Sequence, residues 1–188
     1  MRSSSHSRWF VMAVAIVATA CWTRDPDSLD GGGGGGGGGD AGRASGNDSG
    51  VGTSSGDPAL DDARRYNLER INALRGQKGR TALRLDDKLN AFAQAGSIEL
   101  SQDHRAHANF STNYATCGCD VQAENQGDPN GWTVAPIHDQ IDQILALMMS
   151  EGPGGGHYEN ILGAQSTRLG VGIVNPGAQL YFTNDFGP

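Results

Sequence analysis

The chain has 188 residues, a net charge of −7 at neutral pH, three cysteines and 29 glycines. The acidic balance, without a basic stripe or a patterned run of aromatic residues, argues against nucleic acid as a partner. Only residues 59–188 have the apolar content of a folded unit, and that length is enough for one domain with one core.

The beginning of the chain has the organisation of an export signal, so residues 1–20 are expected to be a signal peptide. Two arginines are followed by the apolar run Trp9–Ala20 and then by Cys21. The run is too short to span a membrane as a helix, which takes about 20 apolar residues. The small residues before Cys21 are similar to a bacterial lipobox, in which the cysteine is acylated; Ala18 replaces the usual leucine, and ordinary signal cleavage is the alternative. We favour lipidation of Cys21, with the N-terminal lipid as the protein's membrane contact.

Residues 21–58 are expected to be a flexible tether between that anchor and the domain. The composition from Trp22 to Asp57 is dominated by Gly, Asp, Ser and Asn, with nine consecutive glycines at 31–39. A segment with so little apolar surface does not offset the entropy that ordering its backbone would cost. A chain of this composition behaves as a flexible linker.

Three helices are expected in the domain from start signals and apolar periodicity. Asp57-Pro58 places an N-cap oxygen before a proline at the first helical position. Gly152-Pro153 ends the third helix, because proline cannot continue it. The expected helices cover residues 58–76, 87–100 and 137–151.

The end of the chain changes from a helical to a strand period. Residues 169–173 alternate apolar side chains with glycine, Asn175-Pro176-Gly177 supplies a turn, and residues 180–186 are rich in Tyr, Phe and Thr. This pattern predicts a β-hairpin. Helices first and antiparallel strands last indicate an α+β fold. The polar residues 108–135 are expected to contain a long surface loop.

Cys117 and Cys119 are separated by Gly118, which allows the tight turn that a disulfide between them needs. An exported protein meets an oxidising environment, in which disulfides form and persist. The alternative is a pair of soft metal ligands, but the chain has no second cysteine cluster to complete a zinc site. We therefore favour a local disulfide.

One histidine stands in an unusual setting, the stretch "EGPGGGHYENIL" at 151–162. Glu151 closes the third expected helix, and the glycines after it let the backbone turn back. His157 is thereby expected near the end of that helix, beside Glu151. Each residue also has an ordinary explanation, as a solvated acid or a loop histidine.

Several segments match a known pattern by their order and spacing. They are "INALRGQKGRTALRLDDKL" at 71–89, "AENQG" at 123–127, "GHYENIL" at 156–162, "GVGI" at 170–173 and "YFTNDFG" at 181–187. Together they resemble the CAP superfamily, the domain of cysteine-rich secretory proteins, plant pathogenesis-related proteins and many bacterial exported proteins. The resemblance implies that residues 59–188 form an α-β-α sandwich, a central antiparallel sheet flanked by helices.

The resemblance also implies a central cleft lined by two histidines and two glutamates. His157 and Glu124 match the family's Gly-His and Gly-Glu-Asn segments directly. Glu151 matches an acid three residues after a helix tryptophan, where this chain has a methionine. The remaining histidine follows the second helix, where spacing favours His107 and His104 is the alternative.

Two imidazoles and two carboxylates in one cleft allow three interpretations. In the first, His107 and His157 bind a divalent ion such as zinc. In the second, the His–Glu pairs carry out acid–base or metal-assisted hydrolysis. In the third, the hydrogen-bond network only stabilises the cleft. Residues 59–188 contain no Gly-x-Ser-x-Gly motif, so covalent catalysis by the domain is not expected. We favour an extracytoplasmic binding or interaction module for a small molecule, a lipid or an envelope component. A hydrolase of peptide, ester or cell-wall substrates is the alternative.

Overall fold

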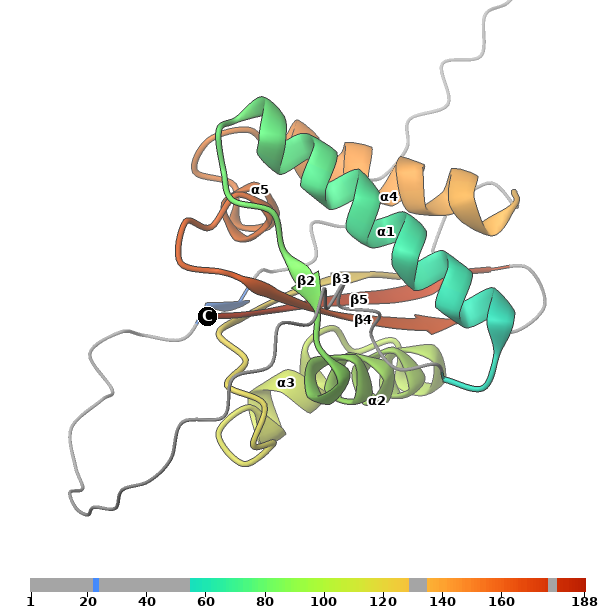
Figure 1. The fold of residues 1–188 in the computed structure, drawn as a ribbon. Helices are drawn as coiled ribbons and strands as arrows, with labels where there is room; N and C mark the ends of the chain where they lie inside the picture. Colours follow the sequence, from blue (N-terminus) through green and yellow to red (C-terminus); the bar gives the residue numbers. More distant parts are fainter. Residues whose placement is uncertain (1–21, 24–54, 129–134, 176–178) are drawn as a thin grey trace, which may run out of the picture.

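Two layers of helices enclose a mixed β-sheet in the computed structural model, which describes residues 22–23, 55–128, 135–175 and 179–188. One face of the sheet is covered by α1 (Pro58–Gln77), α4 (Ile137–Ser150) and α5 (Gly156–Ile161), and the other by α2 (Asp87–Asp103) and α3 (Ala108–Asn113) (Figure 1). The predicted α-β-α sandwich is therefore confirmed. The signal peptide, Cys21 and tether residues 24–54 lie outside the described residues.

The sheet has the strand order β1-β3-β5-β4-β2. The predicted hairpin is present as β4 (Arg168–Val174) and β5 (Tyr181–Gly187), and β3 (Ala123–Gly127) pairs antiparallel with β5. The central strands are antiparallel as expected, and the short edge strand β2 (Arg84–Leu85) adds a parallel pairing with β4. At the opposite edge, β1 (Trp22–Thr23) pairs antiparallel with β3, which brings two residues of the expected tether segment onto the sheet.

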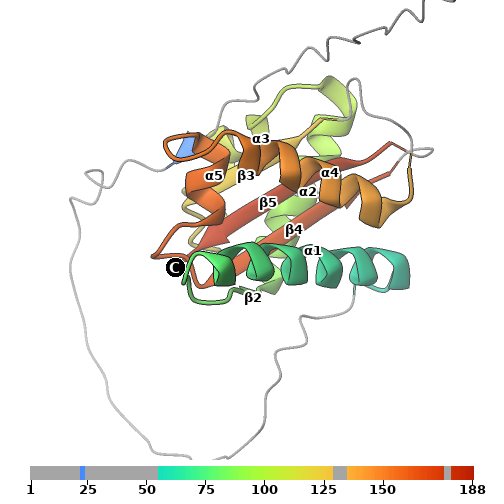
Figure 2. The same ribbon diagram turned by 90° about the horizontal axis from the view of Figure 1, so that it is seen from above.

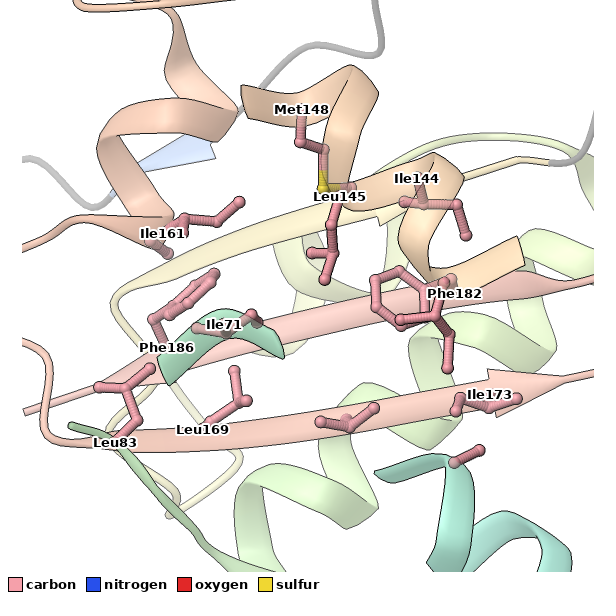
Figure 3. Packing of buried hydrophobic residues seen from close by; sticks show 14 of the residues in the cluster. Ile71, Leu83, Ile144, Leu145, Met148, Ile161, Leu169, Ile173, Phe182 and Phe186 are labelled. Carbon is pink, nitrogen blue, oxygen red and sulfur yellow. The ribbon is translucent and has the colours of Figure 1, made fainter. Parts of the chain in front are cut away.

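The layer of α1, α4 and α5 holds the larger part of the core. Asp57 caps α1 as expected, since its side chain accepts from the backbone N–H groups of Ala59 and Leu60. Seen from above, α1 lies over β4 while α4 and α5 lie towards β3 and β5 (Figure 2). Apolar side chains from these helices meet those of the sheet between the layers, as Figure 3 shows for Ile71, Ile144, Leu145, Phe182 and Phe186, among others.

The opposite layer brings α2 into close contact with the sheet. Asp86 caps this helix by accepting from the backbone N–H groups of Lys88 and Leu89. A Cβ added at Gly170 would lie 2.3 Å from the backbone of Leu89, and one at Gly172 would lie 2.0 Å from the backbone of Ala93. The two glycines of β4 therefore let α2 approach the sheet, and this approach sets the position of the residues that follow α2.

Residues 108–135 were expected to contain a long surface loop; residues 129–134 lie outside the described residues, and residues 108–128 include more regular structure than their polar composition suggested. They contain α3, a disulfide between Cys117 and Cys119, and strand β3, which is buried along its whole length. The predicted disulfide is thus confirmed, with Gly118 at a φ of +63° in the turn. β3 was missed because its sequence, "AENQG", lacks the apolar alternation of a half-buried strand.

Candidate functional site

The inner half of the site is a pair formed by His107 and Glu124. His107 lies between α2 and α3 at a φ of 62°, and Glu124 lies in β3. The imidazole Nδ1 is 2.8 Å from Glu124 Oε1, and the side chains of His107 and Glu124 are 3% and 0% exposed. Because an ionised carboxylate only accepts hydrogen bonds, Nδ1 carries the hydrogen and Nε2 carries the lone pair.

A polar network on the α2 face of the sheet holds the backbone of His107. Its N–H donates to Gln126 Oε1 at 2.6 Å, and Gln126 Nε2 donates to Thr183 Oγ1 at 3.1 Å. The hydroxyl of Ser97 in α2 donates to the same Thr183 oxygen at 2.8 Å. The left-handed backbone of His107, which is uncommon outside glycine, is thereby held by partners on three other elements.

The surroundings of Glu124 change its acidity. Burial raises the pKa of this carboxyl group, while the hydrogen bond from His107 acts in the opposite direction. A Cβ added at Gly96 of α2 would lie 3.4 Å from Glu124 Oε2, so the helix passes close to the carboxylate. The result is a carboxylate shielded from water that accepts a hydrogen bond from a neighbouring imidazole.

The outer half of the site is formed by Glu151 and His157. Glu151 is the C-cap of α4 and His157 lies in the short helix α5, so the histidine is helical rather than in a loop. His157 Nδ1 is 2.5 Å from Glu151 Oε1, and the backbone N–H of His157 donates to Glu151 Oε2 at 3.0 Å. The predicted proximity of these two residues is therefore present in the structure.

The glycines between the two residues have separate roles. Gly152 and Gly154 adopt positive φ angles of 69° and 89°, which turn the chain back after α4. Gly155 is needed for a different reason: a Cβ at this position would lie 2.3 Å from Glu151 Cβ and 2.8 Å from its Oε2. A side chain at Gly155 would therefore displace Glu151 from His157.

Strand β3 connects the two pairs through consecutive residues. Glu124 and Asn125 point to opposite faces of the sheet, as neighbours on a strand do. Glu124 binds His107, whereas Asn125 Nδ2 donates to the backbone carbonyl of His157 at 3.1 Å. Asn160 of α5 donates to Asn125 Oδ1 at 2.9 Å and to the carbonyl of Glu124 at 3.3 Å. Sequence analysis did not identify Asn125 or Asn160 as the residues that connect the pairs.

The two imidazoles share one chemical feature. Nε2 of His107 and Nε2 of His157 are both buried, and neither has a hydrogen-bond partner among the described residues. Within this same part of the chain, no group of three or more His, Cys, Asp or Glu side chains is arranged to hold a metal ion. The arrangement thus offers two imidazole lone pairs, each oriented by its own carboxylate, and no complete set of protein ligands.

The other histidines lie elsewhere. His104, the alternative to His107, caps the end of α2 with its side chain 49% exposed and 2.9 Å from Asp128. His138 on the first turn of α4 stacks on Tyr66 and bonds to Asp62, with its side chain 42% exposed. The histidine that contacts Glu124 is therefore His107.

Comparisons with known proteins agree with this architecture. A family model described as CAP, the cysteine-rich secretory protein family, matches residues 68–186. No curated protein matches the chain. None of the helices in the described ranges has the length and apolar character to cross a membrane.

Solved structures with a similar fold come from several sources. An outer surface protein from Borrelia burgdorferi is 13% identical with a TM-score of 0.51, covering 67% of this chain and 92% of that one. NaASP2 with Zn²⁺ is 15% identical with a TM-score of 0.52, covering 68% and 80%. The CAP domain of enterococcal PrgA is 20% identical with a TM-score of 0.51, covering 65% and 59%. At these identities the similarity establishes the fold alone.

Proposed function

Because the chain belongs to the CAP, or cysteine-rich secretory protein, family, we propose that it is an extracytoplasmic ligand-binding module in which His107 and His157 hold a divalent metal ion such as zinc. The observation that carries the proposal is the buried Nε2 atom of each imidazole, which has no partner among the described residues. The opposite nitrogen of each ring donates to a carboxylate. A carboxylate behind a histidine is the usual support of a metal ligand, because it sets the tautomer and the ring orientation.

The donor set fits a borderline divalent ion, since neutral imidazole is a common ligand of zinc. Two protein ligands are fewer than the four of a closed structural zinc site, so an ion held here would keep open positions for a ligand. When bound, such an ion supplies a Lewis acid that attracts an oxygen or nitrogen of that ligand. NaASP2, which shares this fold, was solved with Zn²⁺, and this supports the choice of ion.

Zinc titration of the purified protein by calorimetry tests the proposal. His107→Ala and His157→Ala should each lower the affinity by about 100-fold or more, because each removes one ligand. His104→Ala and His138→Ala are matched controls, because both side chains are exposed and bonded elsewhere, and they should leave the affinity unchanged. Absence of zinc binding, or binding that is indifferent to His157, would reject the metal site.

Hydrolysis is the second candidate function, and one observation favours it. Burial raises the pKa of Glu124, and a carboxyl with a raised pKa suits general acid–base catalysis near neutral pH. If the protein turns over a peptide, ester or cell-wall substrate, Glu124→Gln should lower the rate by about 100-fold or more. Reproducible turnover that depends on Glu124 would replace the binding module as the better description.

The proposed attachment to the membrane rests on the N-terminal sequence. A signal peptide over residues 1–20 followed by an acylated Cys21 would hold the domain outside the cytoplasm on a lipid anchor. Metabolic labelling with a fatty acid should mark the wild-type protein, and Cys21→Ala should abolish the label. A wild-type protein that takes up no label and is recovered fully soluble would reject the anchor.

A further inference from the structure

Asp185 is a second buried acid beside the inner pair. It lies in β5 directly opposite Glu124 in the antiparallel register of β3 and β5. Side chains at opposed positions of an antiparallel pair lie on the same face of the sheet, with Cβ atoms about 5 Å apart. Both residues are completely buried, with relative exposures of 0%. The sheet therefore places two carboxyl groups side by side in a region closed to water.

Among the residues that the structure describes, none forms an ion pair with Asp185 or donates to its carboxyl oxygens. On its other flank the register partner in β4 is Gly170, which has no side chain. The overlying helix α2 contributes apolar residues such as Leu89 and Ala93. No donor on the described residues reaches either carboxyl oxygen of Asp185. The polar group opposite Asp185 is the carboxyl group of Glu124, and a hydrogen bond between two carboxyl groups requires a proton on one of them.

The bonds of Glu124 indicate which of the two acids holds that proton. Glu124 Oε1 faces His107 Nδ1 at 2.8 Å, and an ionised carboxylate is the stronger acceptor for that hydrogen bond. Two ionised carboxylates in one buried site repel each other strongly, so one of the pair stays neutral. In agreement, burial raises the pKa of Asp185 well above its ordinary range, and the charge of Glu124 raises it further.

We infer that Asp185 is a protonated aspartic acid at neutral pH, that it donates its hydrogen to Glu124, and that it acts as a positioning residue for His107. Glu124 then accepts from Asp185 on one side and from His107 on the other, which holds both its carboxylate plane and the imidazole. The consequence for metal affinity rests on the proposed function. The protonation of Asp185 does not.

The charged groups around this pair are few. Glu124 faces Asp185 from β3, His107 lies beyond Glu124 before α3, and the charge of Glu99 in α2 acts on Glu124 from a distance. The native state therefore binds a proton on Asp185 that the unfolded chain releases above about pH 3.9. Since the native state binds more protons, this residue makes the protein less stable as the pH rises from that value towards the raised pKa.

Carboxyl-selective ¹³C nuclear magnetic resonance on the wild-type chain tests the protonation directly. At pH 7 the Asp185 carbon should keep the chemical shift of a neutral acid, while exposed aspartates such as Asp120 show the ionised shift. An ionised Asp185 at pH 7, or a proton found on Glu124 in its place, would overturn the inference. This measurement needs no variant, so it decides the question even if the substitutions below fail to fold.

The protonation of Asp185 is also tested by measuring the stability of Asp185→Asn against unfolding as a function of pH. The amide keeps a donor towards Glu124 and removes the titrating group. Above about pH 4, the unfolding equilibrium constant of the wild type relative to this variant should rise by about tenfold per pH unit until the raised pKa is reached. Asp120→Asn, whose native side chain is 81% exposed, is the matched control and should not show that rise. A flat ratio for Asp185→Asn would overturn the inference.

The positioning role is read from zinc affinity. Asp185→Ala removes the donor to Glu124 and should weaken zinc binding by about 10–100-fold, as loss of an outer ligand partner does. Asp185→Asn keeps a donor and should stay within about threefold of the wild type. Equal affinities for wild type and Asp185→Ala would overturn the positioning role. If the wild type binds no zinc, the proposed metal site fails, and the resonance and pH measurements still decide the state of Asp185.

Discussion

His107 and Glu124 are 17 residues apart, and their contact joins the segment after α2 to strand β3. His157 and Glu151 are six residues apart, and their contact joins the end of α4 to the start of α5. Both pairs use the same contact, an imidazole Nδ1 against a carboxylate oxygen. The inner pair is completely closed to water, while the side chain of Glu151 in the outer pair is 29% exposed.

The difference shows how one contact is obtained by two means. The outer pair depends on a local backbone path, in which glycines turn the chain back onto the helix it has just left. The inner pair depends on long-range packing, because α2, β3 and β5 must all be in place before Glu124 meets His107. Desolvation also costs more for the inner pair, because both of its side chains are buried.

Removing each glutamate is the strongest test of this contrast. Glu124→Ala leaves buried Asp185 and His107 without their common partner and should lower the free energy of unfolding by about 3–5 kcal/mol. Glu151→Ala should cost about 1–2 kcal/mol, because water reaches the groups that Glu151 leaves. Urea denaturation at pH 7 measures both values. Equal losses would contradict the distinction between an inner and an outer pair.

The outer pair should instead be sensitive to its backbone path. Gly155→Ala places a Cβ 2.3 Å from Glu151 Cβ, and the forced displacement should cost about 1–3 kcal/mol. Gly76→Ala is the control, since a Cβ there meets nothing within 4 Å and alanine in a helix should be neutral or stabilising by about 0.5–1 kcal/mol. Thermal unfolding compares the two. Histidine resonances should show a change at His157 and none at His107, and the reverse pattern would count against the role of Gly155.

Loss of the disulfide should affect the side of the molecule that holds the inner pair and leave the outer pair unchanged. Cys119 packs with Leu89, Phe92 and Phe110 in the apolar cluster beneath the α2 face. Replacing Cys117 and Cys119 together by serine should cost about 1.5 kcal/mol, as expected for so short a closed loop. Thermal unfolding with and without reductant gives the same comparison in the wild type. A change in the resonances of His157 on reduction would show that the two regions are coupled.

Removing Asp86, the N-cap of α2, should cause the smallest loss of stability. The contribution of Asp86 to stability should change with pH in the opposite direction to that of Asp185. Burial acts to raise the pKa of Asp86, but the backbone N–H of Leu89 and the guanidinium of Arg168 outweigh it and lower that pKa. Asp86→Ala should therefore cost about 1 kcal/mol at pH 7. Because a lowered pKa stabilises the fold above about pH 3.9, the cost should vanish as the pH falls through the native pKa. If Asp86→Ala still lowers the free energy of unfolding in acid, the expected direction of the pH dependence is wrong.

The elements with local causes were predicted well from the sequence. Asp57 caps α1, the hairpin of β4 and β5 follows its strand period, and Cys117 and Cys119 form the expected disulfide. Each depends on residues that are only a few positions apart. The close approach of Glu151 and His157 was predicted for the same reason.

Long-range features were not predictable in this way. Strand β3, within residues 108–135 that were expected to contain a loop, was not predicted; its polar side chains are buried because their partners come from other parts of the chain. Arg75 is also completely buried in α1. Its guanidinium donates to the carbonyls of Thr81, Ile161, Gly163 and Ser166. No local pattern identifies those acceptors or distinguishes this arginine from a surface one.

The sequence by itself determined where α1, α2 and α4 begin, where the hairpin turns, and that Glu151 and His157 meet. Caps, turns and apolar periods act over a few residues, so their effects can be read along the chain. Only the tertiary structure decided that His107 rather than His104 meets Glu124, and that Asp185 lies buried against the same carboxylate. Those outcomes depend on which elements pack together, because burial and the pairing of charges are properties of residues that are distant in the chain.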